Sequence, residues 1–142
     1  MADEKFPAIS PILEVVDLDK TIAFYEKFGF KTDMKMPGPG GKTVHAAMMY
    51  NGSCLMLETA DETTVRPVCG GVVFYIDVPN VEDTFKQASK LGVKVVQPLA
   101  DKFWGRRDFT IADLDGYKIT FSQHVKDVTP EDMKKAMMAM AH

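Results

Sequence analysis

A histidine and a glutamate, His45 and Glu58, are the side chains of this 142-residue chain best spaced for proton transfer or metal binding. They flank a segment in which Asn51-Gly52, the dipeptide preferred in type I′ turns, joins two apolar runs into a predicted β-hairpin. A two-residue loop places His45 directly opposite Glu58. Imidazole and carboxylate so paired can act as acid and base or as two metal ligands. The alternative is an ionic hydrogen bond at the rim of the sheet.

The same register divides the hairpin into two faces, because side chains alternate along a strand. One face is mixed and is predicted to line a ligand cleft: His45, Ala47, Met49, Cys54, Met56 and Glu58. The other is uniformly apolar and is predicted to pack under helices: Val44, Ala46, Met48, Leu55 and Leu57. Alternation also assigns to the cleft Glu14, from a strand over 9–16, and Lys118 and Thr120, from the strand that ends at Phe121.

A tryptophan beside two arginines is a second candidate for ligand contact. Trp104, Arg106 and Arg107 lie in KFWGRRD, which is predicted to be a loop that caps the cleft. Indole and guanidinium suit a planar or anionic ligand, through stacking and bidentate hydrogen bonds. The alternative is a surface loop with Trp104 against the barrel.

An internal repeat indicates how these side chains are positioned. TIAFYEKFGFK (21–31) aligns with TFKQASKLGVK (84–94) at an offset of 63 residues, and each block reads strand, helix, three strands. The repeat predicts an α+β fold of two βαβββ modules, about residues 7–60 and 70–124, within a single domain, 1–142. Each module is expected to curl into a half-barrel, and the two to enclose an open cleft.

A C-terminal helix is predicted at about residues 129–140. Thr129 suits the N-cap and Pro130 the first helical position. Its stripe of methionines is typical of packing in a core or a dimer.

Composition excludes several classes of function. The net charge of −3 argues against nucleic acid and anionic membranes as partners. The two cysteines, Cys54 and Cys69, form neither a zinc pattern nor a disulfide framework, and Cys54 is predicted to be a core or cavity thiol. The N-terminus lacks the apolar segment of a signal peptide, so we expect a cytoplasmic protein.

The chain resembles a known superfamily at two places. VVDLDKTIAFYEKFGF and IADLDGYKITF are similar to segments of the vicinal-oxygen-chelate superfamily. That superfamily holds glyoxalase I, extradiol dioxygenases, fosfomycin-resistance enzymes and bleomycin-binding proteins. The C-terminal part, through HVKDVTPEDMKK, resembles the PhnB-like branch.

The resemblance assigns four strand positions that hold a divalent ion in metal-dependent members through His, Gln or Glu. In this sequence they fall at Ser10, Met56, Val72 and Thr120. None of these side chains is a good ligand for a hard or borderline cation. We therefore expect no metal at these positions and no cofactor. Glyoxalase I and extradiol dioxygenase activities are disfavoured.

The resulting hypothesis is a metal-free protein that binds a small molecule, an antibiotic or another planar ligand, as a homodimer like the bleomycin-binding relatives. The side chains expected to contact the ligand are Glu14, Met49, Met56, Phe74, Trp104, Arg106, Lys118 and Thr120. One alternative is an enzyme of lyase, isomerase or dioxygenase-like type with a displaced site at His45 and Glu58. Another is an interaction protein that acts through the C-terminal helix.

Overall fold

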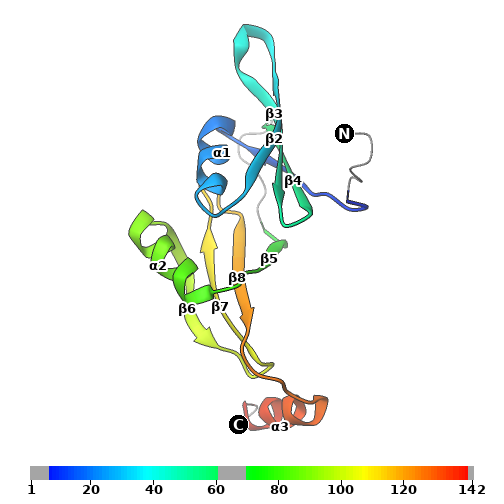
Figure 1. The fold of residues 1–142 in the computed structure, drawn as a ribbon, viewed down its shortest axis with the longest axis vertical. Helices are drawn as coiled ribbons and strands as arrows, with labels where there is room; N and C mark the ends of the chain where they lie inside the picture. The colour runs from blue at the N-terminus through cyan, green and yellow to red at the C-terminus, as the bar shows by residue number, and fades with distance from the viewer. Residues whose placement is uncertain (1–6, 61–69, 141–142) are drawn as a thin grey trace. The chain divides into compact units, whose positions relative to one another are not determined.

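The computed structural model describes residues 7–60 and 70–140, and the chain divides into two compact units, 1–69 and 70–142. We call these units the first and the second module and describe each by itself (Figure 1). The first contains β1 (Ile12–Val15), α1 (Leu18–Glu26), β2 (Lys31–Pro37), the 3₁₀ turn η1 (Pro39–Gly41), β3 (Thr43–Tyr50) and β4 (Ser53–Thr59). The second contains β5 (Val73–Asp77), α2 (Val81–Leu91), β6 (Lys94–Asp101), β7 (Arg106–Ala112), β8 (Lys118–His124) and α3 (Pro130–Met140).

The two modules share one topology. Their four-stranded sheets have the orders β1-β4-β3-β2 and β5-β8-β7-β6. In each, the first and last strands of the module pair in parallel, while the other neighbours are antiparallel. The predicted α+β fold of two βαβββ modules with a C-terminal helix is confirmed.

Helices α1 and α2 begin at side-chain caps that the repeat aligns. Asp17 accepts a hydrogen bond from the Lys20 amide at 3.1 Å, and Asn80 accepts one from the Asp83 amide at 3.1 Å. Each cap satisfies an amide that the first helical turn leaves without a partner. Helix α2 ends at Gly92, whose φ of 69° gives the left-handed cap that glycine favours.

Helix α1 ends before Gly29, the glycine that the repeat aligns with Gly92. Its last residue is Glu26, and the chain continues to Gly29 before it turns with a φ of 93°. The amide of Phe30 then donates to the Tyr25 carbonyl at 3.3 Å. This bond closes the helix end against the start of β2.

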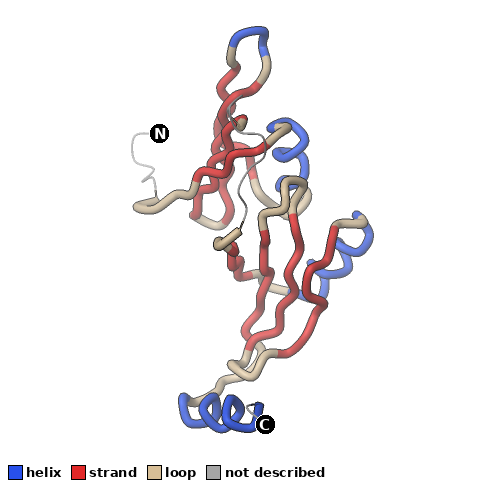
Figure 2. The backbone as a smooth tube through the Cα atoms, turned by 180° about the vertical axis from the view of Figure 1, so that it is seen from behind, coloured by secondary structure: helices blue, strands red, loops and turns tan. Residues whose placement is uncertain are grey.

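Each sheet buries one face beneath a helix of its own module (Figure 2). In the first module that face is the predicted apolar set, with Val44 as its one half-exposed member, and the fully buried residues are Ala46, Met48, Leu57 and Val15. In the second module it carries Phe109, Ile111, Ile119 and Phe121. We call the opposite side of each sheet its open face.

Helix α3 starts where the sequence predicts it. Thr129 Oγ1 accepts from the Asp132 amide at 3.0 Å, and the Thr129 amide donates to the Asp132 carboxylate at 3.2 Å. This reciprocal pair is a capping box with aspartate as its acid. No side chain of α3 is buried within the described residues, so the helix does not pack in the core.

Candidate functional site

The open face of the first module brings His45 and Glu58 together. The turn at Asn51-Gly52, with φ values of 45° and 82°, produces the predicted register, and His45 lies directly opposite Glu58. His45 Nδ1 is 3.4 Å from Glu58 Oε1. The histidine side chain is 19% exposed and the glutamate 46%, so the pair is accessible from the open face. This geometry permits proton exchange with a molecule bound there.

Apolar side chains surround this pair on the same face. Met36 lies opposite His45, and the neighbouring row runs Met34, Ala47, Met56, Ile12 across the sheet. Met36 is 51% exposed and Ile12 is 49% exposed. Glu14 pairs with Glu58 in the parallel register and adds a second carboxylate. The open face of the first module is therefore a methionine-rich surface with acids at one end.

Whether this chain can hold a metal ion depends on the chemistry of its side chains. Among residues 7–60 and 70–140, no three His, Cys, Asp or Glu side chains lie together as a metal site would require. Of the four metal positions that the resemblance assigns, three carry a hydroxyl at Ser10, a thioether at Met56 and an alkyl group at Val72. The fourth, Thr120, is buried, and its Oγ1 lies 2.7 Å from Thr110 Oγ1. These side chains do not suit a divalent ion.

The open face of the second module carries a hydrogen-bonded cluster centred on Tyr75. Its hydroxyl lies 2.8 Å from Ser122 Oγ and donates to Asp108 Oδ2 at 3.3 Å. Arg106 Nε donates to Ser122 Oγ at 2.7 Å, and its Nη2 forms an ion pair with Asp77. The Arg106 guanidinium carbon lies 5.7 Å from the Tyr75 ring centroid, within range of a cation–π contact. We call these five residues the Tyr75 cluster.

The cluster combines buried acceptors with an exposed ring. Asp108 is 3% exposed and Ser122 is fully buried, whereas Tyr75 is 53% exposed. Lys102 Nζ lies 3.8 Å from Asp108 Oδ1, which supplies a charge partner to the buried carboxylate. The polar groups therefore lie beneath an aromatic surface that solvent reaches.

Two assignments from the sequence need correction. Phe74 pairs with Ile119 in the row under α2, so it lies on the opposite face from Thr120, and Tyr75 occupies the open face instead. Arg106 and Arg107 belong to β7, because β6 extends to Asp101 and pairs there with Arg107.

The two arginines consequently point to opposite faces. Arg107 forms ion pairs with Asp101 and Glu82, and this guanidinium holds the pKa of the Asp101 carboxyl below its usual value. Arg107 is thus occupied by β6 and α2, away from the open face. Trp104 stays in the loop between β6 and β7, 40% exposed, in edge-to-face contact with Phe103 at 4.8 Å.

The sequence analysis missed Tyr75, Asp77 and Asp108. Alternation in DFTIA would have placed Asp108 on the face of Thr110, because Phe109 and Ile111 are both apolar. No such signal exists for Tyr75, because the strand VFYID carries large apolar side chains on both faces.

A family model described as the glyoxalase/bleomycin resistance protein/dioxygenase superfamily matches residues 9–121. An uncharacterized protein of Mycobacterium tuberculosis H37Rv is 33% identical over 96% of this chain and 86% of its own length. A bleomycin resistance protein of Geobacillus stearothermophilus is 30% identical over 82% of this chain and 96% of its own length.

Solved structures agree on the fold. TioX from Micromonospora sp. ML1 has a TM-score of 0.67 at 26% identity and covers 85% of this chain and 98% of its own. TnmS3, an antibiotic binding protein from Streptomyces sp. CB03234, has a TM-score of 0.65 at 24% identity, with coverages of 87% and 98%. No helix in the described parts of the chain is long and apolar enough to span a membrane.

Proposed function

Because this chain belongs to the glyoxalase/bleomycin resistance protein/dioxygenase superfamily, we propose that it is a metal-free protein that binds a small planar molecule such as an antibiotic. The proposal depends on one observation: none of the four positions assigned to metal ligands carries a side chain that suits a divalent ion. A thioether, an alkyl group and two hydroxyls replace the usual ligands, and the Thr120 hydroxyl is bonded to Thr110. The bleomycin resistance protein at 30% identity supports binding over catalysis.

Domain organisation, ligand contacts, cellular location and oligomeric state belong to the same proposal. Residues 1–142 act as one domain, and the ligand contacts come from exposed or half-buried side chains. Of the side chains predicted from the sequence, Glu14, Met49, Met56, Arg106 and Lys118 lie on the open face of their own module, Trp104 lies in the loop between β6 and β7, and Thr120 is buried. The protein works in the cytoplasm as a homodimer, and the segment HVKDVTPEDMKK favours the PhnB-like branch.

Metal analysis combined with native mass spectrometry tests this function. The protein is purified without chelator, and we expect substoichiometric divalent metal together with a copurified organic molecule that denaturation releases. Stoichiometric zinc, nickel, manganese or iron that disappears in His45→Ala would contradict the proposal.

The contact between His45 and Glu58 supports a second candidate, an enzyme with a displaced site. The 3.4 Å separation and the accessible imidazole would allow general acid–base catalysis on a bound molecule. This candidate predicts that His45→Gln abolishes turnover of the copurified molecule while thermal stability is kept.

The matched control is His124→Gln. His124 forms a comparable pair with Asp127, at 2.7 Å, on the exposed end of β8. Equal loss of turnover in both variants, or full turnover in His45→Gln, would contradict the displaced site.

A further inference from the structure

We infer that Tyr75 is a fixed aromatic platform on which the second module stacks a planar aromatic anion, with Lys118 holding the anionic group. This inference rests on the proposed function and names the chemical class of its ligand. It is argued from the geometry of the Tyr75 cluster, and none of the four assigned metal positions belongs to that cluster.

The first step is that the Tyr75 ring is both exposed and immobilised. Tyr75 is 53% exposed, yet its hydroxyl is hydrogen-bonded to Asp108 and Ser122, which are 3% and 0% exposed. An aromatic side chain held in this way has already lost its rotational freedom. Binding a ligand on this ring therefore costs less conformational entropy of the tyrosine side chain.

The second step is that the surface next to the Tyr75 ring is apolar. Val73, two residues before Tyr75 on the same face, is 52% exposed and extends the apolar surface. Aromatic rings stack favourably on such surfaces in offset or edge-to-face geometry. The combination favours a flat ligand of more than one ring.

The third step is the charge of this face. The Arg106 guanidinium is paired with Asp77, and the Asp108 carboxylate lies beside Lys102, so these ions neutralise one another. Lys118 lies directly opposite Val73, is exposed, and has no ion pair with any described residue. The remaining charge beside the platform is therefore positive.

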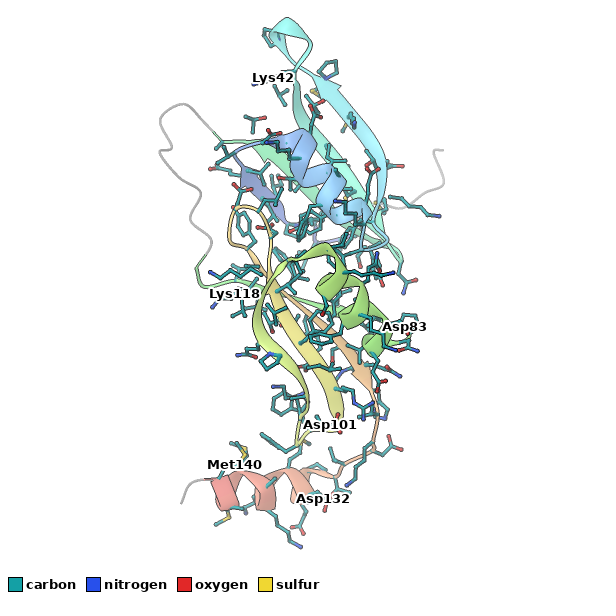
Figure 3. All side chains as sticks on the ribbon, turned by 90° about the vertical axis from the view of Figure 1, so that its left-hand side faces the viewer. Lys42, Asp83, Asp101, Lys118, Asp132 and Met140 are labelled. Carbon is teal, nitrogen blue, oxygen red and sulfur yellow. The ribbon has the colours of Figure 1, made fainter. Side chains whose placement is uncertain are left out.

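A second lysine strengthens the same field. Lys94 and Lys118 both lie opposite Ala112, so they share the open face. Figure 3 shows Lys118 and Asp83 on opposite sides of the second module in that view. The two ammonium groups favour an anion at this end of the sheet.

The fourth step is distance. Tyr75 and Val73 are two residues apart on one strand, which is roughly 7 Å, and Lys118 lies on the adjacent strand. A two-ring aryl carboxylate or sulfonate that stacks on Tyr75 carries its charge beyond the edge of its rings, and the flexible four-carbon stem of Lys118 can span the remaining distance. One ligand can therefore contact both groups.

Calorimetric titration with three matched probes tests the inference. The probes are 2-naphthoate, which is planar and anionic, decahydro-2-naphthoate, which is not planar, and 2-naphthylmethylammonium, which has the opposite charge. We expect 2-naphthoate to bind the full chain about tenfold more tightly than either other probe. An equal or higher affinity for the ammonium probe would overturn the inference, as would no binding of 2-naphthoate at millimolar concentration.

Four variants divide the effect between ring and charge. Tyr75→Ala is expected to weaken 2-naphthoate about tenfold, and Tyr75→Phe only a few-fold, because the ring stays but loses its anchors. Lys118→Gln is expected to weaken 2-naphthoate about threefold at low salt and less at high salt. Lys90→Gln on α2 is the control and is expected to bind like the unmodified chain.

The remaining outcomes are decisive as well. If Tyr75→Ala does not fold, Tyr75→Phe and Lys118→Gln decide, and unchanged affinity in both overturns the inference. Unchanged affinity in a folded Tyr75→Ala also overturns it. A copurified molecule that binds independently of Tyr75 leaves the proposed function intact while the platform fails. A protein with stoichiometric metal and no copurified molecule contradicts the proposed function alone.

Discussion

The resemblance assigns Thr120 to a position that carries a metal ligand in metal-dependent members, and its hydrogen bond to Thr110 makes its energetic role measurable. Both threonines are buried, and their Oγ1 atoms are 2.7 Å apart. Replacing either alone with valine leaves the other hydroxyl buried without this partner. We expect each single variant to lose about 1–2 kcal/mol of unfolding free energy.

The double variant provides the control for this pair. Thr110→Val with Thr120→Val removes both polar groups, so its loss should fall short of the sum of the two single losses by about 1 kcal/mol. Urea denaturation of the four proteins completes the cycle. Strictly additive losses would contradict a direct bond between the hydroxyls.

Cys54 is predicted to be an unreactive thiol. It is 4% exposed, and burial raises the pKa of its thiol above the ordinary value, although the neighbouring Ser10 hydroxyl partly offsets this. Cys54 then carries less thiolate at pH 8 than an exposed cysteine does. Its rate of alkylation should therefore keep rising at pH values where the rate of an exposed thiol no longer changes. We expect native Cys69→Ser protein to react with iodoacetamide more than about tenfold slower than the same protein in urea.

A neighbouring position supplies the control for that experiment. Ser53, one residue earlier in β4, is exposed, and Cys69 lies outside the described residues. Ser53→Cys combined with Cys54→Ser and Cys69→Ser should react at the rate of an exposed thiol. Fast alkylation of native Cys54 would contradict its burial.

Single residues also show where sequence reasoning succeeds. The pairing of His45 with Glu58 follows from Asn51-Gly52, because a two-residue turn fixes every cross-strand pair of the hairpin. The Tyr75 cluster does not follow in this way. Tyr75 reaches Ser122 because β5 and β8 pair in parallel. A connection of 40 residues separates these two strands, so no tight turn fixes their register.

At the scale of elements, the turn between β6 and β7 depends on Gly105. Its φ is 90°, and a Cβ there would clash with the Lys126 carbonyl oxygen. The Gly105 carbonyl in turn accepts from the amides of Val125 and Lys126 at 2.9 and 3.0 Å. This contact holds the segment between β8 and α3 against the turn.

We expect Gly105→Ala to lower the unfolding free energy by about 3 kcal/mol or more, because backbone strain and a steric clash combine. Gly40→Ala separates the two effects. Gly40 has a φ of 81°, but a Cβ added there would meet nothing within 4 Å, so only the backbone term of roughly 1–2 kcal/mol applies. Thermal or urea unfolding measures both variants, and equal losses would contradict the clash.

Element boundaries were predicted less well than element order. The segment that includes Arg106 and Arg107 suggests a loop because it contains Gly105 and four charged or polar neighbours, yet both arginines are in β7. The ion pair of Arg107 with Asp101 stabilises the end of the strand pair. Such a tertiary contact is invisible to local patterns.

At the scale of the whole chain, duplication preserved the topology while the open faces diverged. The first module presents methionines with Glu14 and Glu58, and the second presents the Tyr75 cluster with Lys118. Residues under the helices stay apolar in both modules, because burial constrains them equally. The open faces carry polar side chains even where they are buried, as at Asp108, Thr120 and Ser122, so they are where ligand specificity can evolve within one fold.

We expect helix α3 to form the interface of a homodimer. Helix α3 exposes Met137, Met138 and Met140 at 60%, 62% and 69%, and buries none of its side chains within the described residues. Exposed apolar side chains of this kind favour association with a partner surface. We expect light scattering to give the mass of two chains, and Met137→Lys with Met140→Lys to give the mass of one. Because these methionines are not buried in the chain, the variant should keep the thermal stability of the monomer. Lys135→Gln, on the other side of the helix, should remain dimeric; a dimer that survives both lysine substitutions would show that α3 does not form the interface.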